Sequence, residues 1–151
     1  LSGGGLTAGI ALVLKALRPS LRVIGVSLEV SAPMHASLQA GQPTEIEEVD
    51  SLGDALLGGI GLDNQHTFRI CRDLVDEVVL VSEEDLARGM AYAFHEHRAV
   101  VEGAVIAVLS ALLSGKYDPQ CQPTVVLLSG SNVDTAALAR IALAHPAASF
   151  A

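Results

Sequence analysis

The residues LSGGGLTAGIALVLKAL (1–17) carry the strongest indication of fold in this sequence, because three consecutive glycines stand directly before an apolar run. Residues 6–17 are mostly good helix formers, and Pro19 closes the helix that they predict. Leu1 and Ser2 are typical of the end of a buried strand. Glycine loses more backbone freedom on ordering than any other residue, so three in a row need a reason. A strand, a glycine turn and a helix direct backbone N–H groups toward an anion; the alternative is a disordered chain end.

Composition narrows the class of protein. The 151 residues suit one domain. A content of 50% hydrophobic but only 3% aromatic residues suits aliphatic strands covered by helices. The net charge of −8 and 9 scattered Lys and Arg argue against a nucleic-acid partner. The longest apolar run, residues 103–113, is too short to cross a bilayer, and no signal peptide is visible. We therefore expect a soluble cytoplasmic protein with no membrane partner.

Strands and helices alternate along the chain. We predict strands at residues 22–28, 77–81 and 124–129, and helices at 33–40, 64–74, 82–97, 99–113 and 134–144. Ser82 and Asp85 resemble a capping box at the start of the predicted helix 82–97. This order predicts an α/β fold with three αβα layers and a mostly parallel open sheet. Ligands of such sheets bind beyond the carboxyl ends of strands, where SGGG (2–5) and SGSN (129–132) both lie.

The glycine turn differs from the common nucleotide motifs. No Gly-Lys-Ser/Thr follows it and it lacks GxGxxG spacing, so it suits a single terminal phosphate. Four segments, SGGGLTAGIALVLKALRPSLRVIGV (2–26), DEVVLVSEEDLARGM (76–90), VVEGA (100–104) and VVLLSGSNVD (125–134), resemble the serine/threonine dehydratase family. These are fold-type II pyridoxal-phosphate enzymes, related to serine racemase and tryptophan synthase β. GVSLEVSAPMHASL (25–38) and GGIGLDNQHTF (58–68) resemble the hydroxyectoine-utilisation dehydratase branch.

The resemblance implies pyridoxal 5'-phosphate as cofactor and assigns roles to both turns. Ser129 takes the place of the hydroxyl partner of the pyridine nitrogen, and Asn132 shapes its turn. A branched side chain at Gly4 would stand where the phosphate sits. Taken alone, Ser129 could instead be a strand-end serine that caps the next helix. The family's phosphate loop, whose N–H groups hold the cofactor phosphate, falls on Ser2, Gly3, Gly4, Gly5 and Leu6.

Glu102 is the only charged residue between Arg98 and Lys116, within a predicted helix that is otherwise apolar or small. Burial of an unpaired carboxylate is costly. The VE motif of the family implies a place near the cofactor ring. The alternative is a carboxylate satisfied locally by backbone groups or a neighbouring Arg.

No metal site is predicted. Cys71 and Cys121 form no CxxC pair. His95 and His97 are two apart on a predicted helix and face different ways, so a solvated face is the better interpretation than a shared metal. Ser27 stands where many family members carry a glutamate, which in serine racemase helps to bind a divalent cation. Ser131 and Val105 also replace residues that are commonly glycine in the family.

The chain has no lysine in the context that the family uses to hold its cofactor as a Schiff base. Lys15 lies roughly 15 Å along its helix from Gly5, and Lys116 follows the end of a helix. Neither stands in a Ser-x-Lys-x-Arg-Gly motif. We therefore expect residues 1–151 to be one unit, the C-terminal portion of a longer catalytic region. On this prediction the N-terminal half carries the lysine, and the chain alone holds no catalytic residue and is inactive.

The function implied by the resemblance is a pyridoxal-phosphate-dependent ammonia-lyase or dehydratase. Its substrate would be a small hydroxy amino acid, serine/threonine-like or derived from hydroxyectoine, that reacts by α-proton removal and β-elimination. The intact enzyme would be a homodimer. Two alternatives stay open: an amino-acid racemase that shares the α-proton removal, and a non-catalytic anion-binding or interaction module on the same scaffold.

Overall fold

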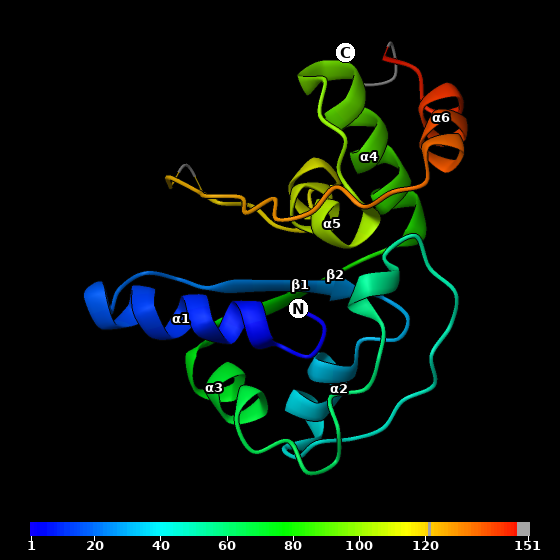
Figure 1. Ribbon diagram of the computed structural model, residues 1–151. Coiled ribbons are helices and arrows are strands. Elements are labelled where there is room, and N and C mark those ends of the chain that lie inside the picture. The colour runs from blue at the N-terminus through cyan, green and yellow to red at the C-terminus, as the bar shows by residue number, and fades with distance from the viewer. Residues whose placement is uncertain (121, 148–151) are drawn as a thin grey trace. The chain divides into compact units, whose positions relative to one another are not determined.

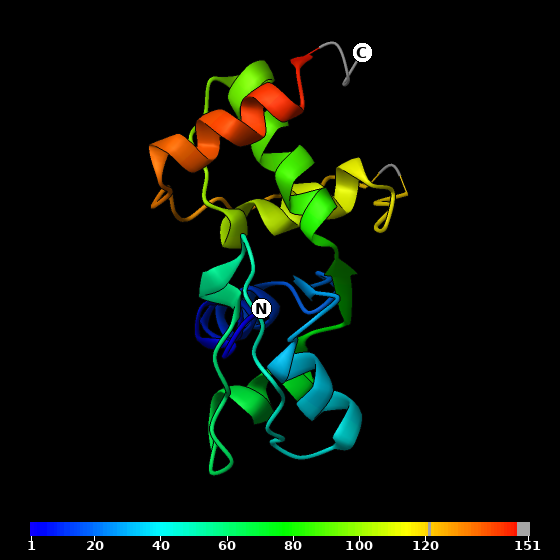
Figure 2. The ribbon, with the colours of Figure 1, turned by 90° about the vertical axis from the view of Figure 1, so that its right-hand side faces the viewer.

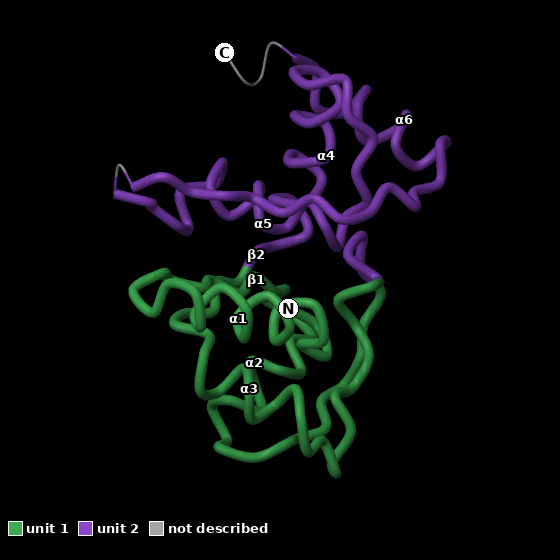
Figure 3. Tube along the Cα trace, turned by 60° about the vertical axis from the view of Figure 1, so that its left-hand side comes forward, with its two compact units in different colours: residues 1–50, 55–80 green, residues 51–54, 81–151 purple. Residues whose placement is uncertain are grey.

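The computed structural model describes residues 1–120 and 122–147 (Figure 1). The chain forms two compact units (Figure 3). The first contains residues 1–50 and 55–80, and the second contains residues 51–54 and the chain from Val81 onward. The short segment 51–54 thus belongs to the second unit although the residues on both sides of it belong to the first.

The first unit is built around two parallel, hydrogen-bonded strands, β1 (Ile24–Leu28) and β2 (Glu77–Val81), of which β2 ends at the unit boundary. Between them the chain forms α2 (Pro33–Ala40), the short 3-10 helix η1 (Asp54–Leu56) and α3 (Thr67–Leu74). Helix α1 (Gly5–Leu17) packs against α3, which also contacts α2. The apolar core of this unit contains Ala8, Met34, Ile60, Phe68 and Cys71.

Helix α1 begins directly after a left-handed residue, Gly4, whose φ is 82°. The helix ends at Leu17, because Pro19, two residues later, cannot continue it. An ion pair of 2.7 Å between Lys15 Nζ and Asp76 Oδ1 ties its last turn to the residue before β2. The predicted helix after the glycines is therefore confirmed.

The second unit is helical. Helix α4 (Glu83–His97) packs against both α5 (Gly103–Leu113) and α6 (Thr135–Ala144) (Figure 2). Gly89 allows the close approach of α4 and α5, because a Cβ at this position would overlap Ser110 Oγ. Ser82 and Asp85 form the predicted capping box at the start of α4.

The strand end predicted at Leu1 and Ser2 stays a prediction: the Gly4 N–H donates to Leu1 O in a turn, and the Leu1 amino group donates to Val26 O of β1. Two local predictions of secondary structure are wrong. Residues 124–129 form no strand, and Val125 is 93% exposed. A strand requires a partner for its backbone groups, and in the described part of the chain this segment has no hydrogen-bonded strand beside it.

The second wrong prediction concerns the start of α5, which is Gly103 and not residue 99. Arg98 adopts a left-handed conformation, with φ of 55°, and the N–H of Ala99 donates back to Ala93 O. This C-terminal cap ends α4 and separates the two helices. The other predicted strands and helices are confirmed with small shifts at their ends. Among the residues described, no helix combines the length and apolar character needed to cross a membrane.

Candidate cofactor-phosphate site

The glycine turn (residues 2–6) leads into the N-terminus of α1 within the first unit. Gly5, Leu6 and Thr7 are the first three residues of this helix, so the helix itself supplies no acceptor for their N–H groups. The N–H of Gly4 is already used, because it donates to Leu1 O at 2.9 Å. Donors for an anion therefore come from the residues around Gly4 and not from Gly4 itself.

The three glycines of this turn differ in the space beside them. A Cβ at Gly3 or Gly5 would meet nothing within 4 Å. A Cβ at Gly4 would lie 2.8 Å from both Cys71 Sγ and Met34 Cε, which belong to the core. A side chain at Gly4 would therefore point into the core. This direction does not support the expectation that it would stand in the phosphate position. The open sides of the turn are at Gly3 and Gly5.

Donor chemistry and space at this turn fit a phosphate group. Ser2 and Gly4 have φ of 44° and 82°, on either side of Gly3. Alternating conformations of this kind form the backbone concavities that bind anions, and the positive end of a helix dipole adds to them. The Ser2 hydroxyl lies 3.5 Å from Leu57 O, at the limit of a hydrogen bond. The residues present can thus hold a phosphate through N–H groups without a charged side chain.

The SGSN turn (residues 129–132) belongs to the second unit, where Ser129 is exposed. Asn132 donates its backbone N–H to Glu102 Oε2 at 2.9 Å. Glu102 lies at the N-cap position of α5, so its predicted place inside a helix is wrong. A backbone partner of Glu102 is thus observed, but it lies 30 residues away in the sequence and is not a local group. A contact with a cofactor ring stays a prediction.

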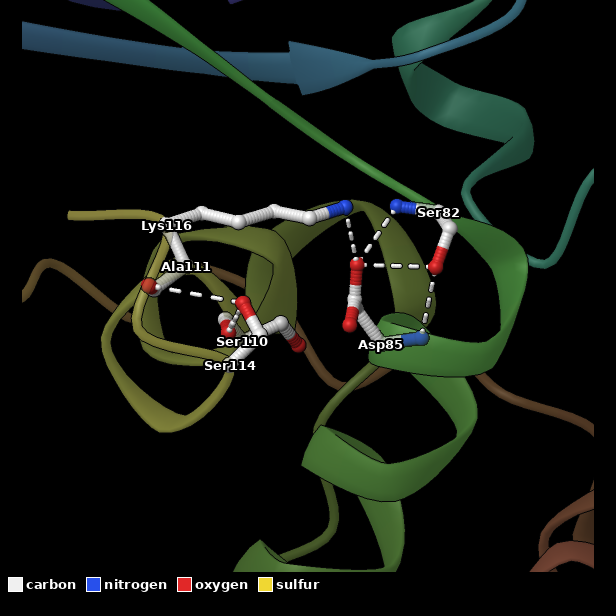
Figure 4. Close-up of polar contacts among 6 residues, drawn as sticks. All are labelled: Ser82, Asp85, Ser110, Ala111, Ser114 and Lys116. Carbon is white, nitrogen blue, oxygen red and sulfur yellow. Dashed lines mark hydrogen bonds and ion pairs between the residues drawn. The ribbon is translucent and has the colours of Figure 1, made fainter.

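Neither lysine is placed as a cofactor-holding amine. Lys15 is paired with Asp76, as described above. Lys116 Nζ lies 2.6 Å from Asp85 Oδ2, within the polar group that caps α4 (Figure 4). An ammonium held in an ion pair is not the neutral amine that attacks a carbonyl.

The remaining polar candidates are buried or have structural partners. His95 is half-buried with Nε2 at 2.9 Å from Ala142 O, so its predicted solvated face is wrong. The ring of His97 lies edge-on against Tyr92. Cys71 is buried against Gly4, and this burial raises the pKa of its thiol. Ser27 is buried in β1.

The described residues contain no candidate metal site. Within residues 1–120 and 122–147, no cluster of three or more His, Cys, Asp or Glu side chains could hold a metal ion. Cys121 lies outside the described residues.

An α/β chain with an open glycine turn at a helix N-terminus has the features of a protein that binds a phosphate-bearing ligand. The chain belongs to the family described as pyridoxal-phosphate dependent enzyme, whose match covers residues 1–130. Relatives and solved structures confirm the resemblance to serine/threonine dehydratases and the fold-type II class.

Three relatives illustrate the similarity. A protein of Sinorhizobium fredii, provisionally named a threonine dehydratase, is 48% identical over 134 residues, which are 89% of this chain and 40% of that protein. The catabolic L-threonine dehydratase of Escherichia coli is 38% identical over 143 residues, 93% of this chain and 43% of the enzyme. Among solved structures, maize serine racemase aligns with a TM-score of 0.80 at 28% identity, over 97% of this chain and 46% of the racemase. The chain thus spans less than half the length of these proteins.

Proposed function

We propose that this chain forms the part of a pyridoxal-phosphate-dependent dehydratase, or ammonia-lyase, that holds the cofactor phosphate and contacts its ring. The observation that carries this proposal is the 38% identity to an L-threonine dehydratase over 93% of the chain. The open glycine turn supports it, because its N–H groups suit a terminal phosphate. The substrate class is a small hydroxy amino acid.

When bound, pyridoxal phosphate supplies an electron sink that makes loss of the α-proton and of a β-hydroxyl possible. The N–H groups of Gly3, Gly5 and Leu6 bind and orient the phosphate. The Ser129 hydroxyl donates to the pyridine nitrogen. Because a hydroxyl is neutral, it leaves that nitrogen largely unprotonated, and the ring is then a milder electron sink. A milder sink suits α-proton removal followed by loss of a β-leaving group.

Ser129 is the residue at which this proposal is tested. In the full-length protein, Ser129→Ala removes a hydrogen bond to a partly buried acceptor, and we expect kcat to fall roughly ten- to a hundredfold. Ser129→Asp favours a protonated ring and should change the ratio of elimination to proton return at Cα. The measurements are cofactor affinity, kcat and the amounts of ammonia, 2-oxo acid and inverted amino acid formed from L-serine and L-threonine.

Ser114→Ala serves as the control, because its hydroxyl donates to Ser110 O within its own helix end. Wild-type values for both Ser129 variants would show that SGSN is an ordinary turn with no contact to the cofactor. A full-length protein that binds no pyridoxal phosphate would favour the non-catalytic module instead.

A racemase is the second candidate, supported by the TM-score of 0.80 with maize serine racemase. It shares α-proton removal with the dehydratase but returns the proton to the opposite face. Formation of D-serine without ammonia from L-serine would identify it. A homodimer, a cytoplasmic location and a hydroxyectoine-derived substrate stay predictions.

A further inference from the structure

Glu102 contacts the SGSN turn across 30 residues of sequence, within the second unit. It occupies the N-cap position of α5, yet its side chain does not cap that helix. Oε2 instead accepts the Asn132 N–H at 2.9 Å. A hydrogen bond to an ionised carboxylate is about twice as strong as one between neutral groups, so this contact can restrain a turn that is otherwise exposed.

The Glu102 carboxylate occupies the space where a Cβ at Gly130 would lie. A Cβ at Gly130 would overlap Glu102 Oε1 and would lie 2.8 Å from Cδ and 3.1 Å from Oε2. Its φ is outside the left-handed region, so its backbone conformation is open to any residue. A side chain at Gly130 would therefore have to displace the carboxylate of Glu102, and not the backbone.

The contacts of Glu102 thus occur at two points of a four-residue turn. One point is the N–H of Asn132. The other is the space beside Gly130, directly after Ser129, where an added Cβ would meet the carboxylate. A second local bond, from Val133 N–H to Ser131 O at 3.0 Å, tightens the chain just beyond. Among the described residues no ion pair competes for the Glu102 carboxylate.

We propose that Glu102 is a positioning residue: its carboxylate fixes the SGSN turn and thereby sets where the Ser129 hydroxyl is presented. The restraint of the turn follows from these contacts alone. Its consequence for a cofactor rests on the proposed function of Ser129. Glu102 acts through the backbone of the turn and so contributes to catalysis without touching the reacting atoms.

The first test measures hydrogen exchange of the Asn132 amide in the full-length protein without cofactor. Glu102→Ala should speed this exchange roughly ten- to a hundredfold, as expected for loss of a charge-assisted hydrogen bond. Glu102→Gln keeps an acceptor oxygen and should restore most of the protection. Glu96→Ala, at an exposed position of α4, is the matched control and should leave the Asn132 amide unchanged.

The second test is a double-mutant cycle between Glu102 and Gly130. Gly130→Ala should destabilise the protein in the wild-type background, because the new methyl group displaces the Glu102 carboxylate from the Asn132 N–H. In the Glu102→Ala background the same change should cost much less. Gly9→Ala in α1, where a Cβ meets nothing within 4 Å, controls for the general effect of replacing glycine.

Unchanged Asn132 exchange in Glu102→Ala, or strictly additive effects of the Glu102 and Gly130 changes, would overturn the proposal. If Gly130→Ala alone fails to fold, recovery of folding in the double variant supports it and continued failure contradicts it. Neither readout requires the cofactor. A full-length protein with the expected exchange and coupling but no affinity for pyridoxal phosphate would retain this role of Glu102 and refute the proposed function instead.

Discussion

At Gly4 a side chain would point into the core of the first unit, because a Cβ there lies 2.8 Å from both Cys71 Sγ and Met34 Cε. Its φ of 82° adds a backbone reason for glycine. Gly3 and Gly5, in contrast, face open space. Consecutive glycines in one turn thus have different surroundings: close packing at Gly4, and open space at Gly3 and Gly5, where we propose that a phosphate binds.

Gly4→Ala should lower the free energy of unfolding by about 2–4 kcal/mol, from left-handed strain together with overpacking. Gly5→Ala, in the first turn of α1 with no neighbour in reach, should keep or slightly raise stability. Urea unfolding of both variants provides the comparison. Equal stability of Gly4→Ala and wild type would show that the core yields at this position.

Asp76 joins two parts of the first unit. Partial burial acts to raise its pKa, but hydrogen bonds from Lys15 Nζ and the Val23 N–H outweigh this and lower the pKa below its ordinary 3.8. The carboxylate form is therefore favoured by folding. Its contribution is present above pH 3.8 and is lost as the pH falls through the depressed pKa of the folded state.

Asp76→Asn should reduce stability at neutral pH and remove part of the loss that wild type shows below about pH 4. Asp50→Asn, at an exposed position, is the control. Unfolding free energies measured between about pH 3 and pH 7 check the prediction. Parallel pH curves for Asp76→Asn and wild type would contradict it.

At the scale of the element, α4 begins with a complete capping box (Figure 4). Ser82 Oγ accepts the N–H of Asp85 at 3.2 Å, and Asp85 Oδ2 accepts both the N–H and the hydroxyl of Ser82 at 2.8 Å. Lys116, just beyond α5, donates to the same carboxylate oxygen at 2.6 Å. The cap therefore also connects two helices of the second unit.

Ser82→Ala should lower the free energy of unfolding by about 1 kcal/mol, the usual effect of losing an N-cap side chain. Lys116→Met removes only the ion pair, which is partly exposed, and should cost less. Thermal unfolding of the two variants ranks the contributions. A larger effect for Lys116→Met would mean that the connection between helices outweighs the cap.

At the scale of the whole molecule, the chain spans 40% and 43% of two threonine-dehydratase relatives, and its described residues place both lysines in ion pairs. Incubation of the 151-residue chain with pyridoxal phosphate, followed by borohydride reduction and peptide mapping, should therefore modify neither Lys15 nor Lys116 specifically. The same treatment of full-length protein should label one lysine outside this chain. A unique adduct at Lys15 or Lys116 with dehydratase activity would contradict this expectation.

Most local features of this fold could be predicted from sequence, because their causes lie within a few residues. The helix after the glycines, its end near Pro19 and the cap formed by Ser82 and Asp85 all depend on hydrogen bonds or steric effects along three or four positions. The family could be predicted as well, from motifs that keep their order along the chain.

Features that depend on distant contacts came from the tertiary structure alone. The direction of a Cβ at Gly4 is set by packing against Cys71, 67 residues away. The partner of Glu102 lies 30 residues on, in a turn whose composition indicates no carboxylate. Residues 124–129 have a strand-like composition but form none here, because a strand is defined by a hydrogen-bonded neighbour. Local periodicity specifies what a segment can form, and only packing decides which partner it meets.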